Sequence, residues 1–144
     1  MRVLWCLGLV AGVTFVPPLA AQSPADSTAI RAAALDYIEG WFAGDADRMA
    51  RALHPELVKR ILVHDDVTGG DLVDGMGATR LIEGTRRKFG EQIPVDQRRT
   101  DVTILDVTGR AASVKVDAGP WVDYMHLVKS GGRWQILNVL WERR

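Results

Sequence analysis

The last part of the chain contains the pattern that most constrains the fold. Two runs of strand-forming residues, 121–129 and 133–141, flank Gly131-Gly132, a dipeptide typical of two-residue hairpin turns. Apolar side chains occur on both faces of the predicted hairpin, so neither face suits open water. We therefore expect one face to cover the helices and the other to meet a second subunit or another large surface.

Counting outward from this turn predicts which side chains share a face. Met125 then lies opposite Asn138, and Asp123 lies opposite Leu140. We assign this face to the interior, together with Trp134. A carboxyl group in an apolar interior is costly unless it is hydrogen-bonded or protonated, which makes Asp123 a candidate functional residue. The opposite face carries the side chains that we expect to form a homodimer interface, Tyr124, His126 and Trp141.

Helix-forming patterns precede the strands. A first segment begins with Asp26 or Ser27 as the capping residue and ends at Gly44. Its apolar side chains recur at helical spacing, and they are Ile30, Ala34, Tyr37, Ile38, Trp41 and Phe42. Asp45 then caps a second, short helix, which His54-Pro55 terminates.

The middle of the chain mixes strand and helix signals. Residues 57–63 are predicted as a strand, 64–77 as a turn-rich loop or loose hairpin, and 78–89 as a third helix. From residue 100 onward the sequence alternates as strands do, with a turn at Thr108-Gly109-Arg110. Helices followed by an antiparallel meander indicate an α+β domain rather than alternating βαβ units.

Residues 1–21 differ from the rest of the chain. Arg2 precedes an almost wholly apolar run, and small residues before Gln22 supply a cleavage point, so we predict a signal peptide over 1–21. The run is shorter than a membrane span needs, with an uncleaved anchor as the alternative. We expect a linker at 22–26, one domain at 27–144, a periplasmic or secreted location, and no stable membrane insertion after cleavage.

Charge and composition argue against several classes of partner. The chain has 18 basic and 18 acidic residues and no basic run longer than Arg86-Arg87-Lys88, so we expect no nucleic-acid partner. His54, His64 and His126 lack the spacing of a metal site, and the single cysteine, Cys6, lies in the leader. No nucleotide or phosphate fingerprint occurs, so we expect neither a metal nor a cofactor.

Three stretches carry a resemblance to a known family: residues 36–41 with Gly44-Asp45, residues 53–55, and the terminal hairpin. In these stretches the chain resembles bacterial proteins grouped as "putative lumazine-binding". That group lies within the nuclear transport factor 2-like superfamily, beside SnoaL-like and ketosteroid isomerase-like proteins. The resemblance implies a cone-shaped fold, in which a curved antiparallel sheet wraps around N-terminal helices and encloses a deep cavity. It also implies frequent dimerisation, and it implies little about activity.

Steroid isomerases of this superfamily use a tyrosine and a protonated carboxylic acid as an oxyanion hole, and an aspartate as the base. The resemblance places Tyr37 at the tyrosine position and Asp123 at the acid position. The base position falls at Ile61, so catalysis would need a base from elsewhere, such as His54 or Asp65. The alternative is a buried tyrosine paired with a buried acid that fixes the helix on the sheet, as buried polar groups usually are paired. The sequence therefore does not decide whether the protein is an enzyme.

We expect the cavity to bind a small apolar or aromatic ligand. Strand alternation turns only one of Lys59 and Arg60 inward, where a cation would pair with an anionic ligand, and we place Arg60 in the site. A solvated side chain with its charged end in water is the alternative for these residues. The predicted binding residues are Tyr37, Trp41, His54, Arg60, Asp123 and Asn138. Three functions stay open: a non-catalytic binding or accessory protein, an isomerase, cyclase or dehydratase, and a structural dimerisation module.

Overall fold

The computed structural model describes residues 23–144, so the expected signal peptide, residues 1–21, lies outside the described residues. The elements are α1 (Pro24–Ala43), α2 (Ala46–Ala52), β1 (Leu53–Asp65), β2 (Gly70–Gly77), α3 (Ala78–Arg86), the 3-10 turns η1 (Phe89–Gln92) and η2 (Val95–Gln97), β3 (Asp101–Thr108), β4 (Ala111–Asp117), β5 (Trp121–Ser130) and β6 (Arg133–Arg143). Within this part of the chain, no helix combines the length and apolar character that a membrane span requires.

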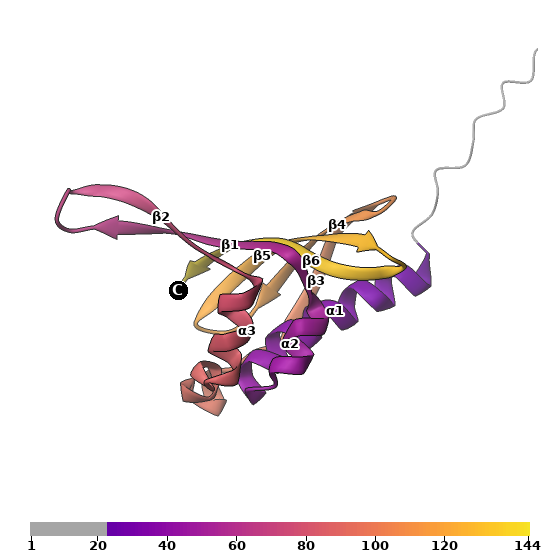
Figure 1. The fold of residues 1–144 in the computed structure, drawn as a ribbon, viewed down its shortest axis with the longest axis horizontal. Helices are drawn as coiled ribbons and strands as arrows, with labels where there is room; N and C mark the ends of the chain where they lie inside the picture. Colours follow the sequence, from indigo (N-terminus) through magenta and orange to yellow (C-terminus); the bar gives the residue numbers. More distant parts are fainter. Residues whose placement is uncertain (1–22) are drawn as a thin grey trace, which may run out of the picture.

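The six strands form one curved sheet in the order β2-β1-β6-β5-β4-β3. The three helices lie together on its concave side, and the β1–β2 hairpin projects beyond them (Figure 1). The predicted α+β class is confirmed. The β1–β2 hairpin lies between α2 and α3, where a strand and a turn-rich loop or loose hairpin were predicted, and one detail differs from the expectation, since β1 runs parallel to β6. Because β1 is long enough to pair with both β2 and β6, it joins the hairpin to the rest of the sheet.

The first helix packs its predicted apolar stripe against the sheet, and Ile30, Tyr37 and Ile38 are buried. Gly44 ends the helix with φ at 65°, a left-handed conformation that glycine adopts without strain. The predicted N-terminal cap was wrong, because α1 begins at Pro24, a residue suited to the first turn of a helix. Asp26 instead lies inside the helix and accepts hydrogen bonds from Lys129 Nζ at 2.7 Å and Trp134 Nε1 at 2.8 Å.

The β5–β6 hairpin turns at Gly131-Gly132, as predicted, with φ values of 56° and 77°. The expected pairing holds from the turn to Leu127 opposite Ile136. Beyond that point a β-bulge leaves Leu137 without a partner in this ladder, and His126 pairs with Asn138. The predicted pairs of Met125 with Asn138 and of Asp123 with Leu140 were therefore wrong.

This one extra residue exchanges the faces of the second half of β6. Asp123 now pairs with Trp141 and Met125 with Val139, so Trp141 faces the concave side. Asn138 and Leu140 face the convex side, where they line a groove. The expectation that Asn138 lies inside and Trp141 outside is corrected by the bulge.

The segment between α3 and β3 closes one end of the cone. Gly90 approaches Trp41 so closely that an added Cβ would lie 2.1 Å from the Trp41 carbonyl oxygen, and only glycine fits there. The guanidinium of Arg98 donates to the carbonyl oxygens of Ile93 and Phe42, at 2.8 Å and 3.3 Å. These contacts hold Ile93 beside the end of α1.

Candidate functional site

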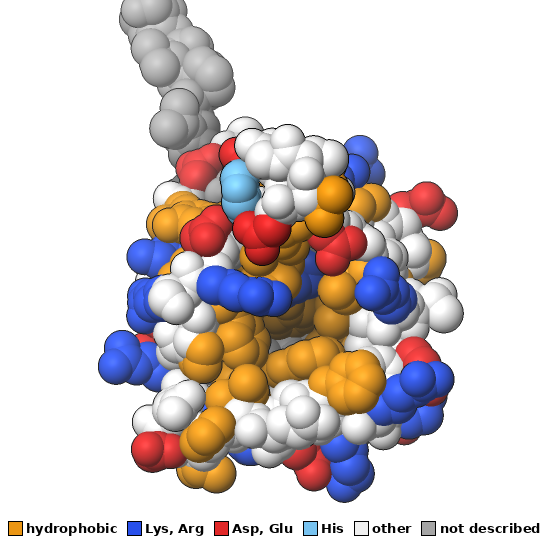
Figure 2. Space-filling view, turned by 90° about the vertical axis from the view of Figure 1, so that its left-hand side faces the viewer, with side chains coloured by type: hydrophobic (Ala, Val, Ile, Leu, Met, Phe, Trp, Pro, Cys, Tyr) orange, Lys and Arg blue, Asp and Glu red, His pale blue; other side chains and the backbone are white. Residues whose placement is uncertain are grey.

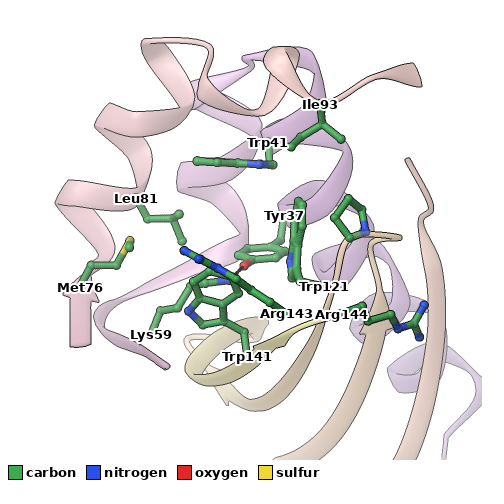
Figure 3. A pocket seen from close by; sticks show the side chains of 11 residues that line it. Tyr37, Trp41, Lys59, Met76, Leu81, Ile93, Trp121, Trp141, Arg143 and Arg144 are labelled. Atoms are coloured by element: carbon green, nitrogen blue, oxygen red, sulfur yellow. Dashed lines mark hydrogen bonds between the residues drawn. The ribbon is translucent and has the colours of Figure 1, made fainter. Parts of the chain in front are cut away.

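A cavity of about 460 Å³ opens on the concave side of the sheet. Figure 2 shows a hollow lined with hydrophobic side chains, with Lys or Arg side chains crossing its rim. Its wall combines residues from α1, β1, β2, α3, the segment before β3, and the open ends of β5 and β6 (Figure 3). The lining residues are Tyr37, Trp41, Lys59, Met76, Leu81, Ile93, Pro120, Trp121, Trp141, Arg143 and Arg144.

A buried polar cluster lies at one wall of this apolar cavity. Lys59 Nζ donates to the Tyr37 hydroxyl oxygen at 2.6 Å and to Asp123 Oδ1 at 2.5 Å. The second carboxylate oxygen of Asp123 accepts a hydrogen bond from Trp121 Nε1 at 2.8 Å. Lys59 and Asp123 are 6% and 0% exposed, so this is a buried ion pair, and it links two strands, β1 and β5, to α1.

Burial and charge act in opposite directions on the ammonium group of Lys59. Burial lowers the pKa of Lys59, and the Asp123 carboxylate offsets part of that effect. Burial and the same carboxylate raise the pKa of Tyr37 well above its ordinary value, so its phenol is neutral at physiological pH. The ammonium group also lies 4.8 Å from the ring centroid of Trp141 and 5.3 Å from that of Tyr37, within the range of cation–π attraction.

One hydrogen-bond donor of the cluster remains available to a ligand. A lysine ammonium has three N–H donors, and Tyr37 and Asp123 accept two of them. The third donor can serve an oxygen atom of a molecule in the cavity. Within residues 23–144 no group of three or more His, Cys, Asp or Glu side chains lies together in a way that could hold a metal ion.

The binding residues predicted from the sequence lie in three parts of the fold: the cavity wall, the convex groove and the start of β1. Tyr37 and Trp41 lie on the cavity wall, and Asp123 lies behind it with both oxygen atoms bonded to protein groups. Arg60 and Asn138 lie in the groove on the convex side of the sheet. The remaining residue, His54, lies at the start of β1 and does not line the cavity. Its ring Nδ1 accepts a hydrogen bond from the Glu56 backbone N–H at 3.1 Å.

Sequence reasoning chose Arg60 over Lys59, and the structure points Lys59 inward. The signal was present: Leu57, Lys59 and Ile61 occupy alternate positions of β1 and are all buried, so the two apolar residues mark the inner face. Arg143, which also lines the cavity, carried no such signal. Its face depends on the bulge at Leu137, and no residue type there marks a bulge.

Comparison with known proteins identifies the family of the chain. The model of the family described as putative lumazine-binding matches residues 25–142. The chain belongs to this family. The resemblance noted from the sequence is thus confirmed, and no curated protein matches the chain.

Solved structures similar to this member of the putative lumazine-binding family share its fold. One is a nuclear transport factor 2-like protein of unknown function from Methylobacillus flagellatus KT, with 19% identity and a TM-score of 0.63 over 88% of this chain and 97% of that one. A second such protein, from Silicibacter pomeroyi DSS-3, has 18% identity and a TM-score of 0.59 over 83% and 97%. A ketosteroid isomerase-like protein from Erwinia carotovora atroseptica SCRI1043 has 15% identity and a TM-score of 0.52 over 84% and 98%.

Proposed function

We propose that this protein binds a small, largely apolar molecule in the concave cavity and releases it unchanged. The observation that carries the proposal is the cavity itself, which is open and lined by four aromatic side chains. Its volume of about 460 Å³ falls within the range of small-molecule sites. A purely structural module whose own side chains fill the cone would not leave this space.

The wall chemistry favours a flat ligand with an oxygen acceptor. Tyr37, Trp41, Trp121 and Trp141 offer ring faces and edges on which a planar molecule can pack. The unassigned N–H of Lys59 supplies a hydrogen bond that would orient such a molecule. This arrangement of apolar walls and a small number of polar groups is typical of binding pockets.

An isomerase-like enzyme that stabilises an oxyanion with Tyr37 and Asp123 is the alternative. It needs both groups to donate hydrogen bonds to the ligand, and it needs a base. Asp123 instead accepts bonds from Lys59 and Trp121, and Ile61, at the base position of the resemblance, is apolar and buried. The lowered pKa of Lys59 in an apolar cavity is the one observation that favours proton transfer, with Lys59 as the base.

Native mass spectrometry on protein purified from its own host compartment tests the binding proposal. We expect a bound mass between about 100 and 400 Da, released without chemical change and absent from a Trp41→Arg variant, which replaces an aromatic surface of the cavity with a charged side chain. Retention of the mass by this variant would place the ligand elsewhere. Consumption of the recovered ligand during incubation with fresh protein would instead favour the enzyme alternative.

We further propose that the convex groove is a homodimer contact. The groove is formed by Arg60, Tyr124, His126, Asn138, Val139 and Leu140, and Tyr124 and Leu140 are 48% and 59% exposed. Large apolar side chains grouped on an open sheet face favour association. Sedimentation equilibrium should give twice the monomer mass, and Leu140→Asp should give a monomer. Dimers that persist in this variant would contradict the proposed face.

Export is also a proposal. The leader pattern at residues 1–21 supports cleavage before Gln22 and a periplasmic or secreted location. Mass measurement of the protein from a cell fraction would show the mature N-terminus at Gln22. A full-length chain in the membrane fraction would support the anchored alternative.

A further inference from the structure

The charges that line the cavity have one sign. Three of its lining residues are cations, Lys59, Arg143 and Arg144, and none is an acid. Acidic side chains are visible in Figure 2 above the hollow, on its upper rim. A molecule that enters the cavity therefore meets cationic groups along the wall itself.

Two of these three cations are neutralised by the protein. Lys59 forms the buried ion pair with Asp123 at 2.5 Å. Arg144 donates to both oxygen atoms of Asp117, at 2.7 Å and 3.2 Å. Such fixed pairs contribute little net charge to a ligand that approaches them.

Arg143 differs from both. Among the described residues, no carboxylate forms an ion pair with its guanidinium, and its Cζ lies 5.6 Å from the ring centroid of Trp141. Figure 3 shows the side chain extending from β6 over Trp141, on the cavity side. An arginine held against an aromatic ring keeps its N–H donors free, in a planar fork that matches a carboxylate.

We propose that the cavity selects a planar monoanion, an aromatic acid whose ring system packs among the tryptophans and whose acid group binds Arg143. This inference rests on the proposed ligand-binding function and narrows it to one ligand class. The ring fills the apolar volume, and the carboxylate stays at the mouth, where it remains partly hydrated. Carboxylate and guanidinium then meet through two parallel hydrogen bonds, without removing either charge fully from water.

Three compounds of nearly equal shape and different charge test the proposal: 2-naphthoate, 2-naphthamide and 2-naphthamidine. Isothermal titration calorimetry on the purified protein at pH 7 measures their dissociation constants. We expect the acid to bind about fivefold more tightly than the neutral amide, as suits a charge-assisted bond at a partly exposed group, and the cationic amidine to bind most weakly. Raising the salt concentration from 0.05 to 0.5 M should reduce the preference for the acid, because the mouth is screened.

Variants assign the preference to one side chain. Arg143→Gln should bring the acid down to the affinity of the amide and leave amide binding unchanged. Arg143→Lys keeps the charge and should retain part of the preference. Arg133→Gln is the matched control, since Arg133 is an exposed arginine at the other end of the same strand and does not line the cavity. Its binding of all three compounds should equal that of the unmodified protein.

The outcomes separate this inference from the proposed function. Equal binding of acid, amide and amidine would overturn the anion preference and leave the cavity as a binding site. A preference for the acid that survives in Arg143→Gln would overturn the role of Arg143. Failure of all three compounds to bind would overturn both the inference and the aromatic binding function on which it rests.

Discussion

Neighbouring residues on the concave and convex faces of the same sheet differ in burial. On β1, Lys59 is 6% exposed and donates hydrogen bonds to Tyr37 and Asp123 in the cavity wall, whereas the next residue, Arg60, lies in the open groove on the other side. On β6, Trp141 lines the cavity and its neighbour Leu140 is exposed. Strand alternation produces this division, so residue type alone says little about the face on which a side chain lies.

The two faces differ in how their charges are satisfied. The concave face carries one ion pair, Lys59 with Asp123, taken out of water and held by Tyr37 and Trp121. The convex groove carries its cation, Arg60, in a setting open to solvent. Buried pairs depend on every member being present, and surface charges do not, so substitutions on the two faces should differ sharply in cost.

The largest expected effect comes from exchanging the two faces. Inserting one alanine after Leu137 would turn Val139 and Trp141 outward and Asn138 inward. Exposing apolar residues and burying an unpaired amide should cost more than about 3 kcal/mol of the free energy of unfolding. Urea denaturation measures this change in the free energy of unfolding.

The same insertion between Gly131 and Gly132 is the control. It only lengthens an exposed turn, where additions are tolerated. If both insertions lowered the urea midpoint equally, the bulge would not determine the faces.

The second effect concerns the buried ion pair. Asp123→Ala should cost about 3 kcal/mol, because it leaves the Lys59 ammonium buried without a counter-ion. The double variant Lys59→Met/Asp123→Leu should recover most of this loss, since apolar residues of similar size can replace a buried pair. Glu142→Ala, an exposed acid on β6, should change stability by less than about 0.5 kcal/mol. A double variant no more stable than Asp123→Ala would mean that the pair itself stabilises the fold.

The sequence predicted most of the fold because its signals were local. The helix end at Gly44, the cap at Asp45 and the turn at Gly131-Gly132 each depend on residues within a few positions. The cavity depended on longer-range geometry. The bulge at Leu137 and the parallel pairing of β1 with β6 arise from how the strands meet, and no single residue marks either.

The candidate site was predicted in part for the same reason. Tyr37 and Trp41 lie on a helix with a clear apolar stripe, so their inward direction followed from spacing. Lys59 required a choice between two adjacent cations, and the flanking buried Leu57 and Ile61 would have decided it. Arg143 lies beyond the bulge, where counting from the turn gives the wrong face.

A smaller effect separates the only two tyrosines of the chain, one on each face. Tyr37→Phe removes an acceptor of the Lys59 ammonium and should cost about 1 kcal/mol in the free energy of unfolding. Tyr124→Phe changes a half-exposed side chain of the convex face and should cost less than about 0.5 kcal/mol. Thermal denaturation of the two variants compares them directly. Equal costs would mean that the Tyr37 hydroxyl contributes nothing through Lys59.

The smallest effect is a pH dependence confined to the alkaline range. The folded-state pKa of Tyr37 is raised above the ordinary value of 10.0 by burial and by the Asp123 carboxylate. The neutral phenol therefore contributes stability that is fully present below pH 10 and is lost as the pH rises toward the folded-state pKa, because the unfolded chain releases this proton first. Tyrosine ionisation followed by absorbance at 295 nm should show a delayed component in the folded protein. This component should persist in Tyr124→Phe, disappear in Tyr37→Phe, and coincide with unfolding rather than precede it. Ionisation of Tyr37 in the still-folded protein, near pH 10, would show that water reaches the Lys59–Asp123 pair through the cavity, and the concave face would then resemble the convex one.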